Sequence, residues 1–261
     1  MSITGAYIER IRQLIEVVAK QEGEIQRAAE WFAASILAGR MVHLFGSGHS
    51  RIMVEEMWPR YGSFPGFNPI VELSLTFHNG VVGANGQRQA MFLENTTGLA
   101  GRILRNYTLS ADDGALVVSS SGCNVVPVEM AEAFQKQGIK VVALVSKVHA
   151  AESASRHPQG RKLHDCADLI LDTGAPTGDA MISVPGLDTP VAPGSTVGGC
   201  LVINALKAEI AQRLVAAGSP PKVLTAGALV GTERAKDLFE AAYDEHAARL
   251  SRLYQFELGL S

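Results

Sequence analysis

The sequence has few cysteines and no long apolar run. Its 261 residues include three cysteines, Cys123, Cys166 and Cys200, which lie far apart and form no C-x-x-C pair. An odd number of separated cysteines provides no disulfide framework, so we expect a reducing, cytoplasmic environment. No stretch approaches the roughly eighteen apolar residues of a membrane span, and the N-terminus lacks the pattern of a signal peptide. We therefore expect neither membrane insertion nor export.

The sequence also lacks an excess of positive charge. Lys and Arg number 23 against 26 Asp and Glu, which gives a net charge of −3. A nucleic-acid surface needs clustered basic residues, so we expect no nucleic-acid partner. The short basic segment 156–162 is typical of a solvated loop, although its Arg156, His157 and Lys162 could reach a phosphate.

Two common nucleotide-binding fingerprints are missing. The segment MVHLFGSGHSR at 41–51 turns from an apolar run into small residues, but Arg51 stands where G-x-G-x-x-G needs its third glycine. No G-x-x-x-x-G-K-[ST] occurs, so no P-loop lysine is available to a nucleoside triphosphate. Small and polar residues fill the turn: Ser47, Gly48, His49 and Ser50. A strand that turns into a helix through such residues forms an anion site from backbone N–H groups and hydroxyls.

Two further turns repeat this chemistry. The segment ALVVSSSGCNVVPVEMAEAF leads from an apolar run into a helix through Ser119, Ser120, Ser121, Gly122, Cys123 and Asn124. A third cluster, Ser195 and Thr196, opens another helical pattern, where either residue also fits an N-cap. The carboxyl ends of parallel strands form the ligand-binding edge of a sheet. We therefore predict that one phosphate monoester is held by the side chains of Ser50, Ser119, Ser121 and Asn124, with Ser195 or Thr196.

Apolar spacing predicts an α/β fold. Strands are expected at 41–46, 69–73, 115–120, 140–146 and 168–173, with helical patterns between most of them, which indicates a parallel sheet covered on both faces. Amphipathic helices lie before and after this pattern, and their apolar stripes need a surface to cover, so we expect a homodimer or tetramer. One domain is expected, with an N-terminal helical segment (1–38), a sheet core (39–218) and a C-terminal helical segment (219–261).

Three segments resemble, in order and spacing, the signatures of the sugar isomerase (SIS) domain: FGSGHS, VVSSSGCN and PGSTVGGCLVINAL. The chain is most similar to the phosphosugar isomerase subgroup near phosphoheptose isomerase and the N-acetylmuramic acid 6-phosphate etherases. The resemblance implies a three-layer α/β/α fold around a five-stranded parallel sheet, a sugar-phosphate ligand and a homodimer. The implied function is an aldose–ketose isomerase or, alternatively, a lyase or a non-catalytic sugar-phosphate sensor. No cofactor is expected, and the histidines lack the spacing of a zinc site.

Isomerisation through an enediol needs a base that works near neutral pH beside the substrate carbonyl. Glu55 and Glu56 follow the first turn by about one to two helical turns, and we predict that one of them, helped by His49 or His78, transfers the proton. Glu94 is a further candidate, because the etherases that the chain resembles carry a catalytic glutamate in a segment of this kind. The alternative for all three glutamates is that they lie on solvent-exposed helix faces and have no catalytic role.

One position departs from the pattern of these relatives. Both carry a catalytic glutamate ten positions after the last serine of the first loop, where this sequence has Arg60. The usual base is therefore missing, which favours the non-catalytic alternative. The assignment of Asp179 is open, because this residue could orient a sugar hydroxyl or cap a turn. Cys123 is interpreted as a small turn residue and not as a nucleophile.

Overall fold

The computed structural model describes residues 2–76 and 86–255. Two helices, α1 (Ile3–Ala19) and α2 (Glu22–Leu37), precede the sheet. The chain then alternates between strands and helices as follows: β1 (Val42–Gly46), η1 (Gly48–Ser50), α3 (Arg51–Met57), β2 (Phe67–Ile70), η2 (Leu73–Leu75), α4 (Gln87–Leu93), α5 (Leu99–Leu104), β3 (Gly114–Val118), α6 (Val125–Lys136), β4 (Lys140–Val145), α7 (Lys147–Glu152), η3 (Leu163–Cys166) and β5 (Leu169–Asp172). The C-terminal part contains β6 (Ala180–Ile182), β7 (Val191–Pro193), α8 (Ser195–Ala216), α9 (Gly227–Val230) and α10 (Thr232–Leu253).

The main sheet has five strands in the order β2-β1-β3-β4-β5, and all its pairs are parallel. The register places Val42 opposite both Phe67 and Gly114, so the carboxyl ends of the three neighbouring strands finish at one edge. The expected α/β fold with a five-stranded parallel sheet is confirmed. The second strand lies at Phe67–Ile70 and not at 69–73, because the chain leaves the sheet there and forms η2 from Leu73.

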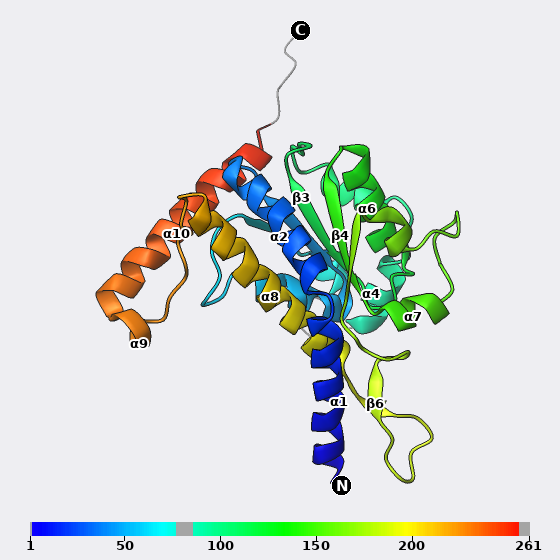
Figure 1. Ribbon diagram of the computed structural model, residues 1–261. Helices are drawn as coiled ribbons and strands as arrows, with labels where there is room; N and C mark the ends of the chain where they lie inside the picture. The colour runs from blue at the N-terminus through cyan, green and yellow to red at the C-terminus, as the bar shows by residue number, and fades with distance from the viewer. Residues whose placement is uncertain (1, 77–85, 256–261) are drawn as a thin grey trace.

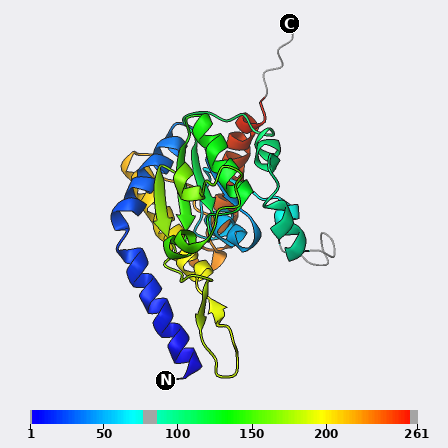
Figure 2. The ribbon, with the colours of Figure 1, turned by 90° about the vertical axis from the view of Figure 1, so that its right-hand side faces the viewer.

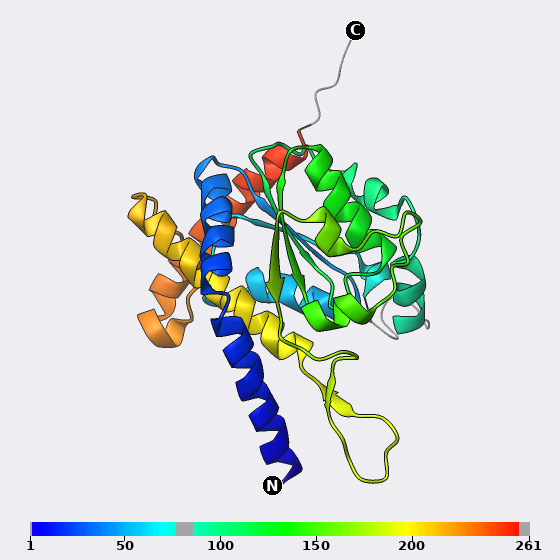
Figure 3. The same ribbon diagram turned by 45° about the vertical axis from the view of Figure 1, so that its right-hand side comes forward.

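Helices cover both faces of this sheet (Figure 3). On one face, α2, α3 and α8 pack against residues such as Leu116 and Val118. On the other face, α5 and α6 pack against Ala115 and Val117, which alternate with them along β3. Successive strand residues point to opposite faces, so a strand covered on both sides is apolar throughout. This explains the unbroken apolar runs in the sequence.

Helix α1 and the antiparallel β6–β7 hairpin extend away from the body of the protein (Figures 1 and 2). The helix is fixed at its base, where Leu14 packs against Met181 and Ile182 of the hairpin. Its other face is apolar and open, because Ile8 and Ile15 are each about half exposed. In the part of the chain that the structure describes, this face remains exposed.

The C-terminal helix α10 packs against the chain's own core. Arg249 donates from Nη1 to the carbonyls of Ile36 and Arg40, each at 3.0 Å. The rings of Tyr243 and His246 lie against Trp58, with centroids 5.6 Å and 5.0 Å away. The proposed division of the chain at residues 38 and 218 stays a prediction. Within the described ranges, no helix is both long and apolar enough to cross a membrane.

A buried polar cluster lies at the amino ends of the strands. Arg40 donates to both carboxylate oxygens of Asp113 at 2.8 Å, and His43 Nε2 lies 3.3 Å from Asp113 Oδ2. Asn68 Nδ2 lies 3.0 Å from the other ring nitrogen of His43. Burial alone raises the pKa of Asp113, but the hydrogen bonds from His43, Arg40 and the backbone outweigh it and hold this pKa below its usual range. The Asp113 side chain is buried beside the counter-charge of Arg40, which is typical of a structural role.

Candidate functional site

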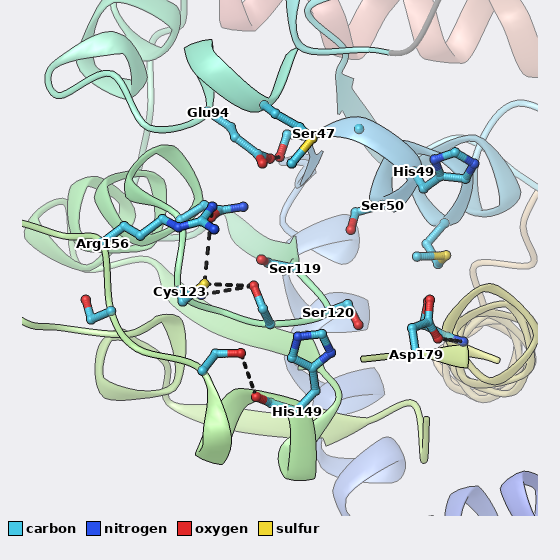
Figure 4. A pocket seen from close by; sticks show the side chains of 18 of the residues that line it. Ser47, His49, Ser50, Glu94, Ser119, Ser120, Cys123, His149, Arg156 and Asp179 are labelled. Atoms are coloured by element: carbon cyan, nitrogen blue, oxygen red, sulfur yellow. Dashed lines mark hydrogen bonds between the residues drawn. The ribbon is translucent and has the colours of Figure 1, made fainter. Parts of the chain in front are cut away.

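The carboxyl ends of β1, β3 and β4 face a cavity of about 580 Å³ (Figure 4). Its wall includes the predicted phosphate-binding residues Ser47, Gly48, Ser50, Ser119, Ser120, Ser121, Asn124, Ser195 and Thr196. Gly122, which was also predicted, does not line the cavity; it lies within the second turn with a φ of 60°. Three segments separated by up to about 150 residues in sequence therefore meet at one edge of the sheet, where open α/β sheets bind ligands.

Small residues make these turns possible. A Cβ on Gly46 would lie 2.6 Å from the carbonyl oxygen of Ser50, so only glycine lets β1 turn directly into η1. A Cβ on Gly198 would lie 1.9 Å from the carbonyl oxygen of Thr173, so this glycine lets α8 begin against the end of β5. The spacing of glycine and serine in the first and third segments thus follows from close backbone contact.

The second turn is held by its own hydroxyls. Gly122 N donates to the carbonyl of Ser119 at 3.1 Å and to its Oγ at 3.2 Å. Ser121 Oγ lies 3.0 Å from Cys123 Sγ and accepts from the Cys123 amide at 3.4 Å. Asn124 occupies the N-cap position of α6. The turn therefore presents a fixed set of hydroxyl, amide and backbone groups to the cavity.

Asp179 caps the start of α8. Its Oδ1 accepts from the amides of Ser195 at 2.7 Å and Gly194 at 3.0 Å, and its Oδ2 accepts from Ser195 Oγ at 2.7 Å. Of the two assignments left open by the sequence, the cap is the contact seen in the structure. Because Asp179 also lines the cavity, it places one carboxylate on this wall and fixes the direction of the Ser195 hydroxyl.

Glu94 is the other acid on the cavity wall. It follows α4, its carbonyl accepts from the amide of Val126 in α6 at 2.9 Å, and its Oε2 accepts from Ser47 Oγ at 2.7 Å. Burial raises the pKa of Glu94 above its usual range, although the Ser47 hydrogen bond and the nearby charge of Arg156 act in the opposite direction. The result is a partly buried carboxyl group fixed at both its backbone and its side chain.

Arg156 is, of the described residues, the one lysine or arginine that lines the cavity. Its Nη1 donates to Asn124 Oδ1 at 2.7 Å. The rest of the basic segment faces elsewhere: His157 Nε2 lies 3.8 Å from Glu132, and Lys162 Nζ donates to a carbonyl at the end of α7 at 2.7 Å. Among the three basic residues considered from the sequence, only Arg156 therefore lines the cavity.

Glu55 and Glu56 do not line this cavity. They line a second one, of about 510 Å³, with Ile52, Pro59, Arg60, Tyr61, Leu224, Phe239 and Tyr243. The cause is the orientation of α3, which buries Met53, Val54 and Met57 in the protein. Glu55 is therefore exposed, and Glu56 lies against Asn204 of α8.

The two acids are also engaged in ion pairs and hydrogen bonds. Glu55 pairs with Arg51 at 3.1 Å, and Glu56 pairs with Arg60. Burial raises the pKa of Glu56, but hydrogen bonds from Asn204 and Arg60 outweigh it, so this pKa lies below its usual range. A carboxylate held in its ionised form by such partners is a weak base.

The predicted histidines have different positions. His49 lines the cavity and lies across it from Arg156 (Figure 4). His78 lies outside the described residues. In residues 2–76 and 86–255, no group of three His, Cys, Asp or Glu side chains is arranged to hold a metal ion.

His149 is a cavity residue for which the sequence gave no functional expectation. It lies in the first turn of α7, where its amide donates to Oγ of the N-cap residue Ser146 at 3.2 Å. The sequence feature that could have identified His149 is its position just after a parallel strand, because β4 ends at the same edge of the sheet as β1 and β3. Ser153 and Ser155 also line the cavity and follow the same strand.

Comparisons with known proteins agree with this arrangement. Residues 6–146, more than half of the chain, match the family model described as the SIS domain. A UPF0309 protein of Halalkalibacterium halodurans is 31% identical over 247 residues, which are 94% of this chain and 96% of that protein. A UPF0309 protein of Listeria innocua is 30% identical over 248 residues, 95% of this chain and 97% of the relative.

A solved structure is similar in fold. The phosphoheptose isomerase GmhA from Neisseria gonorrhoeae matches with a TM-score of 0.50 and 16% identity, over 80% of this chain and 96% of that one. At this identity the match supports the fold. The parallel sheet, the glycine- and serine-rich turns and the family match lead to one conclusion: the chain belongs to the SIS domain family.

Proposed function

We propose that the cavity binds a phosphorylated sugar or amino sugar and that the protein is an aldose–ketose isomerase. The observation that carries this proposal is the meeting of three hydroxyl-rich turns with a partly buried carboxyl group, Glu94, in one cavity. Hydroxyls and amides suit a phosphate monoester, and a carboxyl with a raised pKa suits proton transfer near neutral pH. The proposal depends on the hydroxyl-rich turns and the carboxyl group occurring together in the same cavity.

The phosphate is assigned to the turn Ser119–Asn124 at the start of α6. This helix has 12 residues, so its N-terminus carries a partial positive charge that favours an anion. Arg156 is bonded to Asn124 at this point and adds a permanent positive charge. Ser50 lies on the opposing turn of the same cavity and provides a further hydroxyl.

Glu94 is assigned as the base. In the reaction it takes the proton from the carbon next to the substrate carbonyl, while the carbonyl oxygen gains a proton from solvent water to give the enediol. Glu94 then returns its proton to the former carbonyl carbon. The hydroxyl on the neighbouring carbon gives its proton to the hydroxide left by that water and becomes the new carbonyl, so atoms and charges balance over the cycle. A raised pKa makes the ionised Glu94 a stronger base than an exposed glutamate, and the hydrogen bond from Ser47 fixes its direction.

A non-catalytic sugar-phosphate sensor is the second candidate. The observation in its favour is Arg60, which stands at the position of the family glutamate and pairs with Glu56 outside the cavity. In a sensor the same turns bind the phosphate. Glu94 then accepts a hydrogen bond from a sugar hydroxyl and transfers no proton. The two candidates differ in whether the substrate exchanges a carbon-bound proton with solvent.

Two measurements on the intact protein test these candidates. A thermal-shift screen against hexose, pentose, heptose and N-acetylhexosamine phosphates identifies the ligand, and NMR of that ligand in heavy water detects exchange. The isomerase incorporates deuterium at C1 or C2, whereas a lyase releases a second product and a sensor shows stabilisation alone. If no sugar phosphate raises Tm at millimolar concentration, the proposal is refuted.

We also propose that the protein is a homodimer whose contact includes α1. The support is the open apolar face of this projecting helix, on which Ile8 and Ile15 are about half exposed. Sedimentation at micromolar concentration is expected to give at least twice the chain mass. Ile8→Asp with Ile15→Asp is expected to shift the protein to a monomer, whereas Val148→Asp, at an equally exposed position on α7, leaves the mass unchanged.

A further inference from the structure

Two side chains on the cavity wall have buried polar atoms without a partner. Ser120 Oγ and His149 Nδ1 are shielded from solvent, and no described residue forms a hydrogen bond with either atom. Both residues line the cavity. Buried polar groups in folded proteins are nearly always bonded, so two such atoms on residues of one cavity wall indicate groups kept for a ligand.

The backbone holds these two residues close to each other. The Ser146 amide donates to the carbonyl of Ser120 at 2.9 Å, and Ser146 Oγ accepts from the His149 amide at 3.2 Å. Ser146 itself is fully buried and donates to the carbonyl of Ala175 at 2.7 Å. His149 is further fixed by Ser153, whose Oγ donates to its carbonyl at 2.8 Å. The two side chains are thus presented by a fixed frame.

The charges around the cavity separate its two sides. Arg156 and Asp179 lie on opposite sides in Figure 4, and Ser120 and His149 lie between Cys123 and Asp179 in that view. A phosphate is attracted to the Arg156 side and repelled by the carboxylate of Asp179. A serine hydroxyl can donate and accept a hydrogen bond, and an imidazole nitrogen can form another, so together they can bond both the proton and the oxygen of one hydroxyl group.

We propose that Ser120 and His149 bind the same hydroxyl group of the sugar and make the site selective for sugars that carry it. This inference rests on the proposed sugar-phosphate function and assigns the side of the cavity that reads the sugar. A polar site of this kind rejects an analogue without the hydroxyl strongly, because its own buried atoms are then left unpaired. Ser120 belongs to the turn Ser119–Asn124, but we assign its hydroxyl to the sugar, so the pair acts as a specificity determinant.

The test compares two ligands by calorimetry: inorganic phosphate, and the sugar phosphate that gives the largest thermal shift. His149→Leu is expected to weaken binding of the sugar phosphate by about 10- to 100-fold and to leave the affinity for inorganic phosphate within about twofold. Ser120→Ala is expected to weaken binding of the sugar phosphate by a similar factor. His149→Asn, whose amide can take the position of Nδ1, is expected to recover part of the loss. The double variant is expected to lose less than the product of the single losses, since both groups bind one hydroxyl.

His164→Leu is the matched control, because His164 is partly exposed on η3 and does not line the cavity. If inorganic phosphate weakens as much as the sugar phosphate in the variants, the pair binds the phosphate and the inference is wrong. Unchanged affinity for both ligands, with a wild-type protein that binds the sugar phosphate, refutes the inference alone. A wild-type protein that binds no sugar phosphate refutes it together with the proposed function.

Discussion

The two ends of the parallel sheet carry similar side chains but bond them differently. At the amino ends, Asp113 receives hydrogen bonds from Arg40 and the backbone and is close to His43. At the carboxyl ends, Glu94 receives a side-chain hydrogen bond from Ser47 and lines the candidate cavity. A buried acid surrounded by donors stabilises the fold, whereas one with few donors is available for chemistry.

The pKa values of the two acids express this difference. Both are raised by burial, but the donors around Asp113 reverse the effect, while those around Glu94 do not. Asp113 therefore stabilises the fold above its unfolded pKa, and this stability is lost as the pH falls through its lower folded pKa. For Glu94 the sign is opposite, because the folded state favours the protonated form and loses stability as the pH rises.

Asp113→Asn is expected to have the largest effect. Removing one member of a buried ionic cluster leaves Arg40 without its counter-charge, so the free energy of unfolding is expected to fall by about 3 kcal/mol or more. Denaturant unfolding at pH 7 measures this loss. The difference between wild type and variant is expected to shrink in acid, and a difference that stays constant down to pH 3 would show that the carboxylate charge is not the cause.

Glu94→Gln is expected to reduce turnover by roughly 100-fold or more, with sugar-phosphate affinity little changed. Glutamine keeps the size and the hydrogen bond with Ser47 but cannot take a proton. Deuterium exchange into the sugar phosphate measures turnover, and calorimetry measures affinity. Full exchange by this variant would exclude Glu94 as the base.

The pH dependence gives a smaller effect. Because the pKa of Glu94 is raised, the acid limb of the exchange rate is expected above the usual range of a glutamate. The same shift predicts that Glu94→Gln leaves Tm at pH 7 unchanged or slightly raises it. The free energy of unfolding is expected to increase by less than about 1 kcal/mol. A clear fall in Tm would show that Glu94 is a structural acid like Asp113.

Glu55→Gln is expected to have no effect on exchange beyond about twofold, since Glu55 is exposed and faces the second cavity. Glu56→Gln is expected to leave exchange equally unchanged. These variants are also the matched controls for Glu94→Gln. A large loss of deuterium exchange in either variant would indicate that the base is a glutamate of α3 and would contradict the assignment of Glu94.

The fold and the serine-rich turns could be predicted because they depend on local sequence. Alternating burial of residues such as Leu116 and Val117 produces the apolar runs, and the close contact at Gly46 requires a small residue. The position of the acids could not be predicted in this way. Whether Glu55 or Glu94 faces the ligand depends on how α3 rotates against the core and on the contact between Glu94 and α6.

His149 shows a similar limit. Its side chain faces the cavity because β4 ends beside β3 and Ser146 fixes the first turn of α7. The sequence places His149 near the edge of the sheet, but the absence of a hydrogen-bond partner for its Nδ1 within the described residues becomes visible only in three dimensions. Sequence patterns thus locate the edge of the sheet that carries the candidate site, and tertiary contacts determine which residues line the cavity.

The central claim is that the carboxyl end of the sheet binds the ligand and the amino end is structural. The most direct measurement is a crystal structure of the protein with the sugar phosphate identified by the thermal-shift screen. We expect the phosphate within hydrogen-bond distance of the Ser119–Asn124 turn and the sugar beside Ser120, His149 and Glu94. A phosphate bound in the cavity of Glu55 and Glu56, or anywhere away from the three serine-rich turns, would contradict the account.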